Sequence, residues 1–217
     1  MNASFFKRNG LSLTVLAMML AAWSAQALTG HAAHNQELAE HGQPHLTLLA
    51  YIAGTDFWSA TFENWESEFL QMGVYVLLTV WLRQKGSAES RPLDEKEEET
   101  STTPVHLQPA AWRKGGIVRW LYANSLSLAF LLLFVASFTG HLLGSWRKSI
   151  GEAALHHQLP ERLGQYIADP AFWFESFQNW QSEFLAVLSL IVLSIFLRQK
   201  DSPQSKKVHE PNDKTGT

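Results

Sequence analysis

The sequence has no cysteine and a net charge of only −3, and its 46% of apolar residues would suit a soluble protein if they were not concentrated into blocks between very polar segments. Without cysteine the chain forms no disulfide framework, thiolate metal site or cysteine nucleophile. It also lacks a glycine-rich phosphate loop, a Ser/His/Asp arrangement and a basic nucleic-acid patch. By contrast, nine Trp and thirteen Phe are many for 217 residues. Aromatic side chains collect at membrane–water boundaries, so this composition favours a membrane protein.

The sequence aligns with itself at a constant offset of 115 residues, so that Asn9–Lys85 matches Asn124–Lys200 without a gap. The densest identity is the block Asn-Trp-x-Ser-Glu-Phe-Leu, which begins at Asn64 and again at Asn179, and both copies close with Leu-Arg-Gln-Lys. Identity at a constant offset predicts a tandem duplication.

Each copy holds two apolar segments, which predict an all-α, polytopic membrane protein with four transmembrane helices from a duplicated two-helix unit. The predicted spans lie at about 10–28, 56–84, 118–143 and 170–199. The second segment of each copy has fewer clean apolar residues than the ~20 that a spanning helix needs, so the helix must extend back through the aromatic block. Asp169-Pro170 suits such a start, because Asp is a good N-cap and Pro fits the first helical position.

The predicted organisation follows from these spans. Repeat unit 1 covers 1–85 with an outer helical loop at 31–54, and repeat unit 2 covers 116–200 with an outer helical loop at 147–168. A polar linker, 86–115, joins them, and a polar tail, 201–217, follows. The linker carries a run of acidic residues, and both segments are expected to be disordered because they cannot bury apolar surface.

The basic residues predict an orientation. Placing both termini in the cytoplasm leaves only Arg147, Lys148 and Arg162 of the 17 Lys and Arg residues outside. The positive-inside rule favours this orientation, in a bacterial inner membrane. Both copies then point the same way, related by a parallel pseudo-two-fold axis. A competing interpretation is a cleaved signal peptide ending at Ala25-Gln26-Ala27, but the repeat favours retention, since the matching segment of copy two is internal.

Two glutamates recur at the same depth in the second predicted span of each copy, Glu68 and Glu183. Each lies 15 residues before the arginine of Leu-Arg-Gln-Lys, or about 22 Å along a helix, which places it in the outer part of a ~30 Å hydrocarbon layer. A carboxylate there is costly unless a partner, a cavity or a cation offsets the cost. With Asn64 and Asn179, these glutamates are candidate ligands of a small cation or proton. The alternative is that they form hydrogen bonds between helices or reach a wet surface.

The outer loops repeat a second polar pattern, Glu-x-x-x-His, at Glu37/His41 and Glu152/His156. Residues i and i+4 share one helical face, and neutral imidazole with carboxylate suits divalent first-row metals. The two pairs are therefore candidate ligands of a divalent metal cofactor, or a pH sensor. The alternative is a solvated helix face with an ion pair, since the spacing is not the Glu-x-x-His of di-iron bundles.

At the Asn-Trp-x-Ser-Glu-Phe-Leu block and the Leu-Arg-Gln-Lys run, the chain resembles a bacterial family of small, duplicated membrane proteins, a domain of unknown function. The resemblance covers most of the chain outside the linker and tail. It implies four membrane helices and brings no activity, substrate or site residue. The copies are not identical, however: His141 of copy two corresponds to Gln26, which marks a divergence between them.

These observations lead to three hypotheses about function. The leading one is a non-enzymatic membrane protein that binds or conducts a small cation or proton. The second is a metal-dependent membrane enzyme or sensor that uses the outer-loop pairs, and the third is a structural or partner-binding module. The expected partner is the lipid bilayer, with no nucleic acid; a homo-oligomer or a membrane partner stays open.

Overall fold

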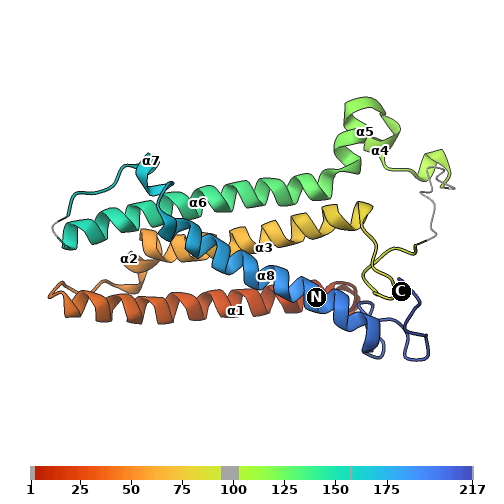
Figure 1. Ribbon diagram of the computed structural model, residues 1–217, viewed down its shortest axis with the longest axis horizontal. Coiled ribbons are helices and arrows are strands. Elements are labelled where there is room, and N and C mark those ends of the chain that lie inside the picture. Colours follow the sequence, from red (N-terminus) through yellow and green to blue (C-terminus); the bar gives the residue numbers. More distant parts are fainter. Residues whose placement is uncertain (1–2, 94–102, 157, 217) are drawn as a thin grey trace. The chain divides into compact units, whose positions relative to one another are not determined.

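The computed structural model describes residues 3–93, 103–156 and 158–216, and all the regular secondary structure in these residues is helical (Figure 1). Its long helices are α1 (Ala3–Glu40), α3 (Thr55–Trp81), α6 (Ser125–Leu155) and α8 (Pro170–Phe196). The shorter elements are α2 (Leu48–Ala53), η1 (Val105–Leu107), α4 (Ala110–Arg113), α5 (Gly116–Ala123) and α7 (Leu163–Tyr166). No strand occurs in these residues, so the all-α prediction is confirmed for them.

Within the described residues, three helices are long and apolar enough to cross a membrane: Phe5–Glu40, Ser125–Ala154 and Pro170–Phe196. Their surfaces carry large apolar side chains that the protein leaves uncovered; Leu132 of α6 is 71% exposed and Phe196 of α8 is 63% exposed. Such surfaces suit contact with lipid. Helix α3 is not among these three helices, because acidic side chains in its first half lower its mean hydropathy.

Two of the long helices, α1 and α6, extend beyond the predicted spans into the predicted outer helical loops, whereas α3 and α8 end at Trp81 and Phe196, a few residues before the predicted ends. Helix α1 continues to Glu40, well into the predicted outer loop, and α6 continues to Leu155. The segment after the apolar run of α1 is rich in Ala, Gln, Glu and Leu, which lose little side-chain freedom in a helix. A helix can therefore continue past an apolar run without a break in its backbone hydrogen bonds.

Helix α8 begins as Asp169-Pro170 predicts. The Asp169 carboxylate accepts a hydrogen bond of 2.8 Å from the backbone N–H of Ala171, and Pro170 occupies the first helical position. The shorter α2 starts in the same manner, with the Thr47 hydroxyl accepting from the N–H of Ala50 at 3.3 Å. Helix α3 begins at Thr55 itself.

The chain divides into two compact units, each described by itself. Unit 1 holds Met1–Thr61 and Leu142–Leu163, and unit 2 holds Phe62–His141 and Gly164–Thr217. The core of unit 1 comprises Ala27, Tyr51 and Phe57, with Trp23, Ile52 and Trp58 packed against it. Trp23 also donates its indole N–H to the Thr61 hydroxyl at 3.2 Å, which connects α1 to the start of α3.

In unit 2 the two Leu-Arg-Gln-Lys runs end α3 and α8 in the same way. The Nη1 of Arg83 donates to the carbonyls one, three and four residues before it, at 3.0 to 3.1 Å. The Nη1 of Arg198 donates to the corresponding three carbonyls, at 2.9 to 3.5 Å. A guanidinium at a helix C-terminus satisfies free carbonyls and faces the negative end of the dipole. This physical role accounts for both arginines.

The correspondence continues beyond the aligned segments. The N–H of Gln84 donates to the Ser90 hydroxyl at 2.9 Å, and the N–H of Gln199 donates to the Ser205 hydroxyl at 2.9 Å. The backbone turns through the left-handed region at Gly86 and Asp201, 115 residues apart, with φ of 82° and 62°. The same loop therefore follows both helices, although the sequence alignment stops at Lys85 and Lys200.

The tail, expected to be disordered, forms hydrogen bonds with the loop after α3. The Lys206 ammonium, whose residue is 1% exposed, lies 2.5 to 3.3 Å from four backbone carbonyls: those of Gly86, Ile195, Asn212 and Lys214. The N–H of Gly216 donates to the Ser87 carbonyl at 2.9 Å. These contacts join the tail to the start of the predicted linker; residues 94–102 of that linker lie outside the described residues.

Candidate functional site

The most buried polar contact of unit 2 joins α6 to α3. His141 Nδ1 lies 3.0 Å from Glu66 Oε2, and both side chains are 0% exposed. On the other edge of the ring, His141 Nε2 lies 3.7 Å from Glu175 Oε2 of α8, whose side chain is 48% exposed. A buried imidazole therefore stands between a buried and a partly accessible carboxylate.

Three further side chains complete this group. Glu63 of α3 is half-buried, and its Oε1 accepts a hydrogen bond of 2.6 Å from Asn179 Nδ2 of α8. Trp180 donates its indole N–H to Glu66 Oε1 at 3.2 Å. We call the set Glu63, Glu66, His141 and Glu175, with the donors Asn179 and Trp180, the His141 cluster.

Helix geometry explains why these residues meet. Glu63 and Glu66 are three residues apart on α3, and Glu175 and Asn179 are four apart on α8, so each pair lies on one helical face. Next to His141, Gly140 lets α6 approach α3: a Cβ at this glycine would lie 2.5 Å from the Phe62 ring. This close approach brings the imidazole within reach of the two glutamates of α3.

The cluster is rich in negative charge. Helices α3 and α8 contain no Lys or Arg, and α6 has none before Arg147, so His141 is the sole basic side chain on the segments that carry the cluster. Three carboxylates consequently share one imidazole. Phe172, 1% exposed, packs on the imidazole with ring centroids 5.2 Å apart and limits access of water to it. Negative charge held this way is stabilised by a bound cation.

The donor atoms also converge on one point. Glu63, His141 and Glu175 each offer one ligand atom, and these three atoms lie within 4.8 Å of one another. Imidazole nitrogen with carboxylate oxygen is a set that binds zinc, manganese and iron. The same set can hold a proton between an imidazole and a carboxylate.

The residues predicted from the repeat lie beside this cluster rather than within it. Glu68 and Asn64 are exposed, whereas Glu183 and Asn179 are half-buried. The backbone carbonyl of Glu183 accepts a hydrogen bond from Gln71 Nε2 at 2.8 Å. Asn179 alone of the four enters the His141 cluster. Binding of a cation by Glu68 and Glu183 stays a prediction.

The predicted outer-loop metal residues gather in unit 1. Glu37, His41 and Glu152 line one cavity of about 290 Å³, and the rings of His41 and His156 lie 5.9 Å apart. Other partners occupy several of these groups. The Lys148 ammonium lies 3.6 Å from Glu152, and His41 Nδ1 lies 3.0 Å from the Glu37 carbonyl, one helical turn back. A metal site in this cavity stays a prediction.

The internal repeat does not indicate the His141 cluster, because the titratable residues of the cluster lie at positions where the two copies differ. In the internal alignment the four pairs are Glu63 and Gln178, Glu66 and Gln181, Glu175 and Ala60, and His141 and Gln26. A search for shared residues selects Glu68 and passes over Glu66, two positions away. These four mismatches, of which His141 and Gln26 is one, are the signal in the sequence that marks the cluster.

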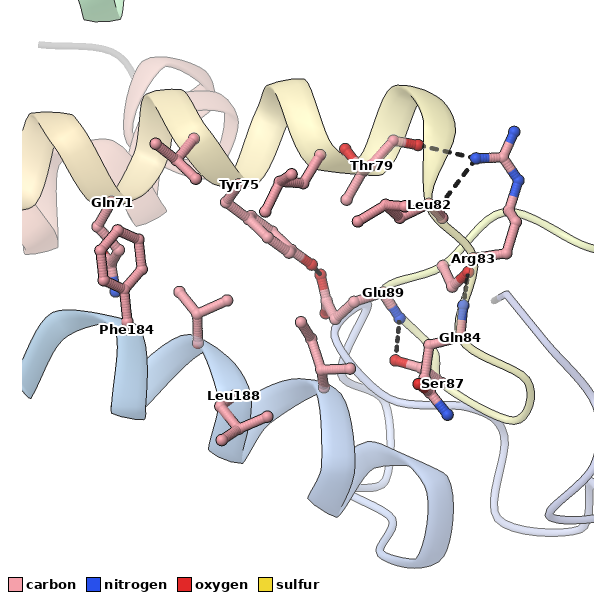
Figure 2. A pocket seen from close by; sticks show the side chains of 15 residues that line it. Gln71, Tyr75, Thr79, Leu82, Arg83, Gln84, Ser87, Glu89, Phe184 and Leu188 are labelled. Carbon is pink, nitrogen blue, oxygen red and sulfur yellow. Dashed lines mark hydrogen bonds between the residues drawn. The ribbon is translucent and has the colours of Figure 1, made fainter. Parts of the chain in front are cut away.

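Unit 2 has a hollow lined by α3, α8 and the loop after α3, with a volume of about 290 Å³ (Figure 2). Phe184 and Leu188 of α8 line it beside the side chains of α3. At its polar end the Tyr75 hydroxyl donates to the Glu89 carboxylate at 3.1 Å. Its walls are mainly apolar, and it lacks the convergent ligand atoms of the His141 cluster.

Comparison with known proteins places the chain in a family. No curated protein and no solved structure matches it. A family model described as DUF6766, a domain of unknown function, matches residues 2–217. This match includes every residue of the His141 cluster and both capping arginines. The protein therefore belongs to the DUF6766 family.

Proposed function

We propose that this protein is a multi-pass membrane protein that binds a small cation, a metal ion or a proton, at the His141 cluster. The observation that carries the proposal is the fully buried His141–Glu66 contact, which lies next to two more carboxylates on helices without Lys or Arg. Buried charges are retained when they are paired or when they bind an ion. Here the acids outnumber the available base.

The membrane part of the proposal includes α3 as a fourth span. Its second half is apolar and leaves Leu77, Leu78 and Val80 exposed at 41%, 45% and 42%. It corresponds in the internal alignment to α8, which has the hydropathy of a span. The proposal also includes duplication of a two-span unit, which the internal repeat supports. It places both termini in the cytoplasm, which the distribution of Lys and Arg supports. The proposed location is a bacterial inner membrane.

The position of the cluster along the helices supports a site near one membrane boundary. Glu66 precedes Arg83 by about 25 Å of helix, and Glu175 precedes Arg198 by about 34 Å. With the arginines at one boundary of a ~30 Å core, Glu66 lies inside the core and Glu175 at the opposite edge. The exposed fractions of the two side chains, 0% and 48%, follow the same order. An ion could enter from the aqueous side of Glu175.

The test is cation-dependent thermal unfolding of the protein in lipid nanodiscs. Melting temperatures are measured over a range of pH and with Na⁺, Mg²⁺, Mn²⁺ and Zn²⁺ for the wild type, Glu66→Gln and Glu68→Gln. A cation at 100 times its Kd stabilises a protein by about 2.7 kcal/mol, which raises the melting temperature by about 5 to 10 °C at this size. We expect this response in the wild type and in Glu68→Gln, and its loss in Glu66→Gln. Identical responses in all three proteins would refute the proposal.

A second candidate is metal binding in the outer-loop cavity of unit 1, as a sensor or enzyme site. The convergence of Glu37, His41 and Glu152 on one cavity favours it. Under this alternative, Glu37→Gln with His41→Gln removes the cation response, whereas Glu66→Gln preserves it. The same melting experiment therefore separates the two sites.

A further inference from the structure

We infer that the His141 cluster is a divalent transition-metal site, with Glu63, His141 Nε2 and Glu175 as ligands and Glu66 as the residue that positions His141. The inference rests on the proposed function and specifies its ion. The inference goes beyond the proposed function because it assigns different roles to the neighbouring acids: Glu63 and Glu175 bind the metal ion, and Glu66 positions His141.

The distance between His141 Nε2 and Glu175 Oε2 suits two ligands of one metal ion better than a direct hydrogen bond. At 3.7 Å it exceeds the usual N–H···O distance of about 2.7 to 3.2 Å. Two ligands at about 2.1 Å from one tetrahedral ion lie about 3.4 Å apart, and two neighbouring ligands of an octahedral ion about 3.0 Å apart. The observed distance therefore needs a shift of well under 1 Å to suit two ligands of one ion. Glu63 completes the trio within 4.8 Å.

The contact with Glu66 orients the imidazole for metal binding through Nε2. Glu66 Oε2 lies 3.0 Å from His141 Nδ1. When the ring is neutral, a proton on Nδ1 satisfies this contact and leaves the lone pair of Nε2 directed toward Glu175. A carboxylate that accepts from one histidine nitrogen while the other binds metal fixes the tautomer and strengthens the ligand. Trp180 donates to the other oxygen of Glu66 and holds that carboxylate in place. Glu66 is thus occupied on both oxygens and acts through His141.

The remaining ligands of the proposed site are the carboxylates of Glu63 and Glu175, together with water. Asn179 donates to Glu63 Oε1, which orients this carboxylate and leaves its second oxygen for the ion. Glu175 is 48% exposed, so water can fill the open coordination positions from its side. One imidazole with two carboxylates is typical of Mn²⁺, Fe²⁺ and Zn²⁺ sites, whereas Ca²⁺ and Mg²⁺ prefer oxygen alone.

The experiment uses Co²⁺ as a spectroscopic probe of the full chain in lipid nanodiscs, purified without a polyhistidine tag. Visible absorption reports the ligand field, equilibrium dialysis gives stoichiometry and Kd, and competition with Zn²⁺ gives the Zn²⁺ affinity. We expect one Co²⁺ per chain, and a loss of affinity of at least 10-fold in Glu63→Gln and Glu175→Gln. Because Glu175 is partly exposed, Glu175→Gln should fold; circular dichroism and gel filtration verify this.

The role of Glu66 has its own readout. Glu66→Gln should weaken Co²⁺ binding by about 10- to 100-fold and shift the absorption spectrum without changing the coordination number. Glu68→Gln, two residues away on α3, tests the alternative cation site at Glu68 and Glu183. It should bind Co²⁺ like the wild type if the metal lies at the His141 cluster, and a loss of binding in this variant would overturn that assignment. An unchanged spectrum in a folded Glu66→Gln protein would overturn the positioning role.

The outcomes also separate this inference from the proposed function. Co²⁺ binding that survives Glu63→Gln and Glu175→Gln, or that disappears in Glu37→Gln, overturns the metal assignment. So does the absence of Co²⁺ and Zn²⁺ binding when the melting temperature still responds to pH or Na⁺ through Glu66, a result that leaves the proposed function standing. If neither metal ions nor other cations give a response that depends on the cluster, both fail.

Discussion

The contact between Glu66 and His141 gives a quantitative prediction about the free energy of unfolding of the protein. The two side chains form a 3.0 Å contact with no exposure to solvent. Replacing His141 by Leu leaves the Glu66 carboxylate buried with Trp180 as its remaining donor, which should cost about 3 to 5 kcal/mol. Glu66→Met should cost less, about 1.5 to 3 kcal/mol, since it removes a hydrogen bond to a charged group. Replacing both partners by apolar groups should cost little more than Glu66→Met alone.

The assay is a double-mutant cycle on the free energy of unfolding in mixed micelles without added metal. The expected coupling energy is at least about 1.5 kcal/mol. The control cycle pairs His141→Leu with Glu68→Met, and should be additive within about 0.5 kcal/mol because Glu68 is exposed and has no part in the buried contact. A coupling of Glu66 with His141 as small as in the control cycle would refute the reasoning about the buried pair.

Three further predictions test other parts of the fold. Gly140→Ala should destabilise the protein by about 1 to 3 kcal/mol, since its Cβ would lie 2.5 Å from the Phe62 ring, whereas Gly151→Ala, with no atom within 4 Å, should not; thermal unfolding compares them, and equal effects would contradict the close approach. Burial, and then the charge of Asp56, raise the pKa of Tyr51 above its ordinary value of 10.0, so its stabilising contribution is complete below pH 10 and is lost as pH rises through the folded-state pKa; Tyr51→Phe should show a smaller alkaline loss of stability, and an unchanged alkaline profile would count against it. Lys206→Met should expose the loop after α3 to hydrogen exchange and proteolysis, because four carbonyls lose their shared donor; unchanged protection there would show that this lysine does not hold the tail.

Much of the fold follows from local sequence signals. Apolar runs and the Asp169-Pro170 start predict the long helices because these signals act within a few residues of each other. Helix is also predicted in the outer loop at 31–54, but the polar composition of that segment does not show that it continues α1 to Glu40 without a break. The ordered tail is invisible in composition, because Lys206 makes its contacts with carbonyls from distant parts of the chain.

The candidate site depends on tertiary contacts that the repeat could not indicate. Glu66 and Glu68 have the same chemistry and lie two residues apart, yet a helix turns about 200° between them, so one is buried and the other exposed. The alignment favours Glu68 because its partner is also Glu. His141 becomes informative only when α6 is placed against α3, where Gly140 permits the approach.

The hydrogen bonds of the C-terminal segment have a practical consequence for handling this protein. The polar composition of residues 201–217 suggests a tail to which a purification tag can be attached, or which can be deleted. Either change acts on a segment whose Gly216 N–H and Lys206 ammonium are bonded to the loop that follows α3. A C-terminal deletion would therefore remove contacts with the loop after α3 and with the C-terminal end of α8.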